Sequence, residues 1–169
     1  MQPEFTLALI RALKPMHTVI ETSGYADTKH FRQAVELADL IMLDIKHSDS
    51  HLHKQMTGLG NELIIQNLMA LKAAKKPFIV RIPIIPGFND TQENMAATAS
   101  MLEVGDYLQY VELLPYNQLA GAKYPLLGLS FSFRRGANKE ELCEVTDERL
   151  SMLSGVLESF GLRVKYVRC

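Results

Sequence analysis

The chain has 169 residues, of which 47% are hydrophobic and 22% are charged. This is the length of about one globular domain and the composition of an ordinary water-soluble fold. Eighteen basic and nineteen acidic residues leave a formal charge of −1, which argues against a broad basic surface for nucleic acid or an anionic membrane. Apolar runs are short and the N-terminal segment carries charges, so we expect one cytoplasmic domain, residues 1–169, without a membrane span.

The first half of the chain predicts helices and short apolar strands in alternation. The first helix begins at Pro3 and carries Phe5, Leu9, Ala12 and Leu13 on its expected apolar side. Asp27 is predicted to cap the second helix, and Asn61 to cap the helix after a short polar one. The expected strands and helices of this half are Thr18–Thr22, a helix after Asp27, Leu40–Lys46, Asp49–Gln55 and a helix after Asn61.

The second half continues the alternation around one irregular stretch. Asp90 and Glu93 have the spacing of a capping box, and Thr146 is predicted to cap the last helix. The expected elements are strand Pro77–Pro83, a helix to Leu102, strand Tyr110–Pro115, an irregular stretch Tyr116–Lys139, a helix to Gly161 and strand Arg163–Val167. Nearly continuous apolar strands separated by helices predict parallel pairing and an α/β fold. The chain is too short for a full eight-fold barrel, so an open or incomplete barrel is expected.

Polar residues gather where the predicted strands end, which is where sites of parallel α/β folds lie. In Leu40–Lys46 the alternation of a strand places Met42, Asp44 and Lys46 on one face and the apolar residues between them on the other. An acid and a base on one sheet face either pair with each other or bind a ligand. The residues alone do not decide between an ion pair and a ligand site.

Two further strand ends add charged groups. Glu21 and Thr22 end the first strand, where they either accept from the following turn or form an oxygen-rich corner for an ammonium group or a small cation. Arg81 either holds a carboxylate ligand or pairs with Glu21 or Glu112. His47, His51 and His53 lie in a polar segment and are predicted to belong to a solvated helix face rather than a metal site.

Several of these segments together carry a resemblance. They are Val19–Ala26 (VIETSGYA), Leu43–Lys46 (LDIK), His53 with Thr57-Gly58, Asn61 with Asn67, Arg81–Asp90 (RIPIIPGFND), Glu112–Tyr116 (ELLPY) and Lys123-Tyr124. In this order and spacing they resemble the pyruvate formate-lyase activating enzymes and related glycyl-radical-enzyme activating enzymes of the radical S-adenosylmethionine superfamily. The resemblance covers essentially the whole chain and implies a partial (β/α)6 TIM-like barrel.

The resemblance also implies a chemistry. In this family a [4Fe–4S] cluster, reduced by flavodoxin or ferredoxin, cleaves S-adenosylmethionine to a radical that removes a hydrogen atom from a glycine of a partner enzyme. By position, the cofactor-binding residues would be Glu21, Thr22, Asp44, Lys46, Arg81 and Asn117. A monovalent cation site would take Glu21, Thr22, Met42 and Asp44. Lys46 would approach the carboxylate of the cofactor.

The chain departs from the family pattern in three places. Asn117 stands where Leu-Pro-Tyr is usually followed by His. The cluster motif CxxxCxxC and the Gly-Gly-Glu motif are both absent, and only Cys143 and Cys169 are present. The chain is therefore expected to be a C-terminal fragment that lacks the first two strands, has no catalytic residue of its own and is inactive alone. The stretch Gly121–Lys139, where the family closes over its partner, is expected to be mobile in isolation.

Two other functions are compatible with the residues alone. Lys46 beside Asp44 could act as a base or form an imine in a self-sufficient (β/α)-barrel lyase or aldolase. Asp44 at a strand end could instead belong to a receiver-like interaction domain without catalytic activity. Such a domain would need an acidic pair at the end of the first strand, where Glu21-Thr22 offers a single acid.

Overall fold

The computed structural model describes residues 2–102, 105, 107–116, 126, 128 and 145–166. The predicted alternation of helices and strands is confirmed over these residues. The elements are α1 (Pro3–Ala12), β1 (Val19–Thr22), α2 (Thr28–Leu37), β2 (Leu40–Asp44), α3 (Ser50–Thr57), α4 (Glu62–Ala73), β3 (Phe78–Ile84), α5 (Gln92–Leu102), β4 (Leu108–Pro115), α7 (Asp147–Ser159) and β5 (Val164–Tyr166). Asn117 and the stretch Gly121–Lys139 lie outside the residues described in full.

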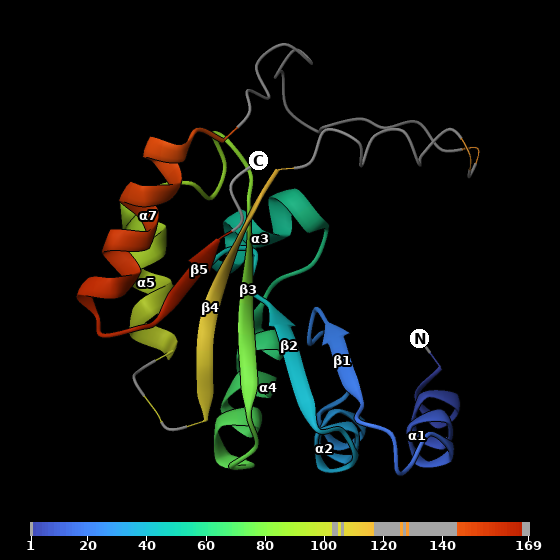
Figure 1. The fold of residues 1–169 in the computed structure, drawn as a ribbon. Coiled ribbons are helices and arrows are strands. Elements are labelled where there is room, and N and C mark those ends of the chain that lie inside the picture. The colour runs from blue at the N-terminus through green and yellow to red at the C-terminus, as the bar shows by residue number, and fades with distance from the viewer. Residues whose placement is uncertain are drawn as a thin grey trace.

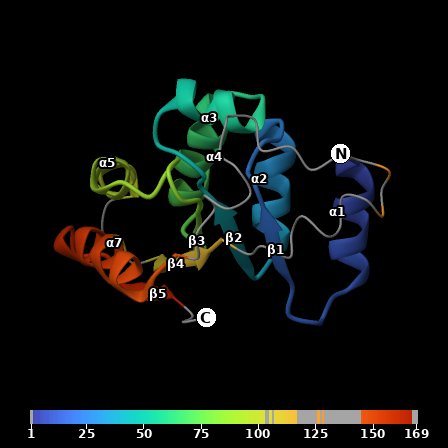
Figure 2. The same ribbon diagram turned by 90° about the horizontal axis from the view of Figure 1, so that it is seen from above.

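The five strands form one sheet in which every neighbouring pair is parallel, in the order β1-β2-β3-β4-β5 (Figure 1). Seen from above, the helices surround one side of the curved sheet (Figure 2). Parallel neighbours need a crossover connection, and here the crossovers between β1 and β4 run through helices on that side. The predicted α/β class is thereby confirmed, and none of the described helices covers the other face of the sheet, the open face.

The hydrophobic core lies between the sheet and these helices. Leu43, Val80 and Leu113 are fully buried on the strands, and they pack against helix residues such as Leu68 and Leu153. On β2 and β3 the strand residues of the core alternate with the residues of the open face, so Leu43 and Val80 lie on the helix side, whereas Ile79 shares the face of Arg81. A slip of one residue between strands would move the apolar side chains of the helix side out of the core, so their burial fixes the register of the sheet.

Side-chain caps fix several of the helix starts. The Asp27 carboxylate accepts hydrogen bonds from the amides of Lys29 and His30, and the Thr146 hydroxyl accepts one from the Arg149 amide. Both predicted caps are confirmed. Each cap satisfies amides that the first helical turn leaves without a partner inside the helix.

Asn61 is the N-cap residue of α4 as predicted, but two predicted capping interactions are absent because the side chains of Asn61 and Asp90 bond elsewhere. Asn61 makes no cap bond at α4, and its amide instead donates to two backbone carbonyls of the loop after β2. Asp90 and Glu93 do not form a capping box, since the Thr91 hydroxyl accepts from the Asn94 amide. Asp90 accepts from the Gly87 amide and forms an ion pair with Arg149, whose Nη2 lies 3.0 Å from its Oδ2.

The expected apolar side of α1 is also corrected. Leu7 and Ile10 are the buried residues of α1, whereas Phe5 and Leu9 are 62% and 45% exposed. Apolar residues occur on more than one side of this helix, so spacing alone did not select the contact face. None of the helices in the described ranges is both long and apolar enough to cross a membrane.

Candidate functional site

The candidate site lies on the open face of the sheet, toward the carboxyl ends of β1, β2 and β3. Strand pairing places Glu21 opposite Met42, and Asp44 opposite Arg81. The predicted alternation along β2 is confirmed, because Ile41, Leu43 and Ile45 are buried in the core while Met42, Asp44 and Lys46 are only partly buried. The strands therefore deliver charged side chains to one rim from separate parts of the sequence.

Arg81 is the centre of this rim. Its Nη1 lies 2.8 Å from Glu21 Oε2, and its Nε lies 3.3 Å from Glu112 Oε2 without the geometry of a hydrogen bond. The Arg81 side chain is 20% exposed, whereas that of Glu21 is 65% exposed. A partly buried guanidinium held between two carboxylates is more strongly fixed than a surface ion pair.

Lys46 extends the rim beyond the end of β2. Its ammonium lies 3.1 Å from Asp44 Oδ2, and each of the two side chains is 30% exposed. The structure therefore brings together four of the predicted site residues, namely Glu21, Asp44, Lys46 and Arg81, with both signs of charge represented. Such a rim can bind a ligand that carries an ammonium and a carboxylate group.

Two of the predicted site residues stand apart from this group. The hydroxyl of Thr22 accepts a hydrogen bond from the Gly24 amide, and Thr22 lines a small cavity on the helix side together with Ile20 and Phe31. Consecutive strand residues face opposite ways, so the Thr22 side chain lies on the other face from Glu21. Asn117 falls outside the described residues.

The sequence predicts Glu112 only as one of two alternative partners of Arg81, whereas the register makes it part of a longer row. Asp44, Arg81, Glu112 and Lys165 are successive cross-strand neighbours on β2 to β5 and alternate in charge. Lys165 also lies 3.7 Å from the centroid of the Tyr110 ring. Only Asp44 ends its strand, and the other three lie inside theirs, so the row becomes visible only once the register of β2 to β5 is known.

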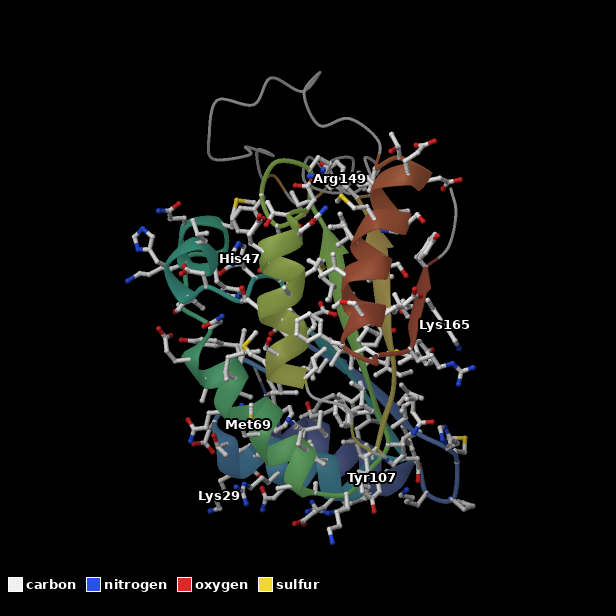
Figure 3. The ribbon with its side chains drawn as sticks, turned by 90° about the vertical axis from the view of Figure 1, so that its left-hand side faces the viewer. Lys29, His47, Met69, Tyr107, Arg149 and Lys165 are labelled. Carbon is white, nitrogen blue, oxygen red and sulfur yellow. The ribbon has the colours of Figure 1, made fainter. Side chains whose placement is uncertain are left out.

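The prediction of a solvated histidine face is wrong for two of the three histidines. His47 and His53 are 5% and 3% exposed, while His51 is exposed. His47 accepts a hydrogen bond from the Asp49 amide at Nδ1 and packs against the Phe88 ring, with centroids 5.1 Å apart. Figure 3 shows His47 between α3 and α5.

The buried position of His47 affects its protonation. Burial lowers the pKa of His47, the negative charge of Asp49 partly opposes this effect, and His53 adds to it. His53 Nδ1 lies 2.7 Å from the Leu59 carbonyl oxygen. Among the described residues no three histidine, cysteine or acidic side chains are grouped to hold a metal ion.

Comparison with known proteins agrees with this architecture. The model of the radical SAM superfamily matches residues 1–99, and the chain belongs to this superfamily. A crystal structure of a domain of pyruvate-formate lyase-activating enzyme from Bacteroides vulgatus superposes with a TM-score of 0.79 at 21% identity. It covers 99% of this chain and 92% of that chain, which confirms the predicted partial-barrel fold over this part of the protein.

The curated relatives are named as activating enzymes of lyases, a dehydratase and a decarboxylase. The isethionate sulfite-lyase activating enzyme of Nitratidesulfovibrio vulgaris is 42% identical over 131 residues, which are 75% of this chain and 42% of the relative. The (2S)-3-sulfopropanediol dehydratase activating enzyme of Klebsiella oxytoca is 36% identical over 79% of this chain and 44% of its own length. The chain thus spans less than half the length of these relatives.

Membership implies S-adenosylmethionine and a [4Fe–4S] cluster as cofactors of the complete protein. The residues present fit the two cofactors differently. The charged rim fits the amino-acid end of S-adenosylmethionine. The sequence has only two cysteines, Cys143 and Cys169, 26 positions apart, which cannot supply the thiolates that hold such a cluster. The cluster therefore has no protein ligand set within this chain.

Proposed function

We propose that the rim formed by Glu21, Asp44, Lys46 and Arg81 binds the methionyl end of S-adenosylmethionine. The observation that carries this proposal is the meeting of these four side chains on the open face, in a chain that belongs to the radical SAM superfamily. A free amino acid group carries one positive and one negative charge, so its binding needs both carboxylates and cations nearby. This rim offers carboxylates and cations together, in the ion pairs Lys46–Asp44 and Arg81–Glu21.

The residues divide by charge. Lys46 receives the ligand carboxylate, and Glu21 and Asp44 receive the ammonium group or a monovalent cation beside it. Met42, which lies next to Glu21 across the strands, and the main chain of Thr22 complete the proposed cation site. Arg81 fixes the Glu21 carboxylate through their ion pair, and its positive charge also attracts the carboxylate of the ligand. Asn117 follows β4 and Tyr116 in sequence and is retained as a contact proposed from the family resemblance.

The proposed role of the complete protein is activation of a glycyl radical enzyme of the pyruvate formate-lyase type, with flavodoxin or ferredoxin as reductant. This role rests on the relatives, whose names describe activating enzymes for isethionate sulfite-lyase, choline trimethylamine-lyase and similar lyases. A chain with two cysteines is expected to be inactive alone. An in-frame CxxxCxxC and Gly-Gly-Glu encoded upstream of Met1, beside a gene for a glycyl radical enzyme, would support the role.

The binding site can be tested on the chain itself by nuclear magnetic resonance. We expect millimolar S-adenosylmethionine or methionine to shift the backbone amide signals at the carboxyl ends of β1, β2 and β3, whereas adenosine leaves them in place. Lys46→Ala should abolish most of the response. Asp39→Asn is the matched control, because Asp39 lies before β2 and its carboxylate bonds to Thr18 rather than to the rim.

Two outcomes would contradict the proposal. One is a response to S-adenosylmethionine that is absent at the rim or unchanged by Lys46→Ala. The other is borohydride trapping of an imine between Lys46 and a carbonyl compound, which would favour the lyase or aldolase interpretation instead.

A further inference from the structure

The backbone that carries Lys46 is held by a buried asparagine from another loop. The Asn89 side chain is fully buried, and its Nδ2 donates to the Lys46 carbonyl at 2.8 Å and to the Pro83 carbonyl at 2.6 Å. Its Oδ1 accepts from the Ile85 amide at 2.7 Å. All the hydrogen-bonding groups of this amide are thus used to join the end of β2 to the end of β3.

Asn89 acts at the place where strand pairing stops. The last backbone bond between the two strands runs from the Ile45 amide to the Arg81 carbonyl, at 2.9 Å. Beyond it the chain turns away into the loop before α3, and the Lys46 carbonyl has no partner in the sheet. A buried carbonyl without a hydrogen bond is costly, and the Asn89 amide supplies that bond.

Two more buried asparagines secure the residues that follow. Asn94 accepts from the amide and hydroxyl of Ser48, at 2.9 and 2.7 Å, and donates to the Asn89 carbonyl at 2.9 Å. Asn61 donates to the carbonyls of His47 and Ser48, both at 2.9 Å. Each residue from Lys46 to Ser48 is therefore held by a side-chain amide, and Asn94 links this set to Asn89.

We propose that Asn89 is a positioning residue for Lys46. By fixing the main chain of Lys46 against the end of β3, Asn89 directs the Lys46 ammonium back to the Asp44 carboxylate and keeps it at the rim. Asn89 itself has no contact with the rim side chains in the bonds described above. The consequence for cofactor binding rests on the proposed function, whereas the placement of Lys46 against Asp44 is a property of the chain alone.

The test uses the lysine side chain as its own reporter. Reductive methylation with ¹³C-formaldehyde gives each lysine a methyl signal, and Lys46→Arg assigns that of Lys46. In the wild type, Asp44→Asn should shift the Lys46 signal because it removes the neighbouring charge. In an Asn89→Ala background we expect loss of most of this shift, because the released Lys46 no longer lies beside residue 44.

Asn67→Ala is the matched control. Asn67 is also fully buried, and its Nδ2 donates to the carbonyls of Gly24 and Ala26 at 2.8 and 2.7 Å. Its removal therefore deletes two side-chain amide to backbone carbonyl bonds, like those that Asn89 donates, from the loop after β1. We expect the shift caused by Asp44→Asn at Lys46 to persist in this background, although the chain loses a similar amount of stability.

The outcomes separate the two proposals. An unchanged response of Lys46 to Asp44→Asn in the Asn89→Ala chain overturns the positioning role, and so does an equal loss in Asn67→Ala. If Asn89→Ala does not fold, Asn89→Asp keeps the volume and the acceptor for Ile85 and is expected to lose the same response at neutral pH. In a further outcome, the response of the Lys46 signal to Asp44→Asn is lost in Asn89→Ala while the wild-type Lys46 signal does not shift on addition of S-adenosylmethionine. That result would reject the binding proposal and leave the positioning role intact.

Discussion

The two faces of β2 differ although their residues alternate along a single strand. On the helix face Ile41, Leu43 and Ile45 are at most 2% exposed and belong to the hydrophobic core. On the open face Asp44 and Lys46 form an ion pair in which each side chain is 30% exposed. One face therefore supplies the stability of the sheet, and the other keeps charged groups available for a ligand.

The largest expected effect tests the helix face. Leu43→Ala should lower the free energy of unfolding by about 2–5 kcal/mol, because the side chain is fully buried and its loss leaves a cavity. Met42→Ala, one residue earlier on the open face, should cost about 1 kcal/mol or less, because Met42 is only partly buried. Urea unfolding followed by circular dichroism measures both. Equal losses for the two variants would contradict the division between the faces.

A smaller effect is expected from the open face. Arg81→Met removes the cation between Glu21 and Glu112 and leaves two carboxylates close together, so we expect a loss of about 1–3 kcal/mol. Glu21→Gln should change stability by about 0.5 kcal/mol or less, because Glu21 is 65% exposed. Urea unfolding again measures both variants.

A double variant sharpens this comparison. Arg81→Met combined with Glu112→Leu should recover much of the loss, because it removes a partly buried charge together with its partner. If the double variant is as unstable as the sum of its single changes, the Arg81–Glu112 pair is not the source of the effect.

Local patterns were sufficient to predict one face of the sheet and most element positions. The alternation in Leu40–Lys46 correctly separated core from rim, and the caps Asp27 and Thr146 were found because a cap acts within three residues of itself. The register also places Asp44 opposite Arg81, as expected of one shared rim, although Arg81 lies in the middle of β3 rather than at its end. These features depend on the period of a strand or one turn of a helix.

Contacts between distant segments could not be predicted in this way. Asn89 lies 43 residues from Lys46, and Asp90 lies 59 residues from Arg149. Nothing in the local sequence distinguishes an asparagine that caps a helix from one whose amide holds another loop. Asn61 is an example, since it stands at the start of α4 but its side-chain amide holds the loop after β2. Glu21 and Thr22 are adjacent in sequence and share a predicted site, yet strand alternation separates their side chains.

The buried histidines give the smallest and most specific prediction. Because burial lowers the pKa of His47 below its ordinary value of 6.5, the unfolded chain binds a proton more readily than the folded chain. The contribution of neutral His47 to stability is therefore fully present above pH 6.5 and is lost as the pH falls through that value toward the folded pKa. The slope of the unfolding free energy with pH that His47 contributes corresponds to the uptake of at most one proton on unfolding.

A comparison of two variants isolates this effect. His47→Asn keeps an acceptor near the Asp49 amide but cannot titrate, so its unfolding free energy should fall less steeply than that of the wild type as the pH drops below 6.5. His51→Asn is the matched control, because it makes the same substitution at an exposed histidine whose side chain bonds to Gln55. Urea unfolding at a series of pH values measures the slopes. Parallel profiles for wild type and His47→Asn would show that His47 is protonated as easily in the fold as in water, and the helix segment after β2 would then be as solvated as its polar sequence predicted.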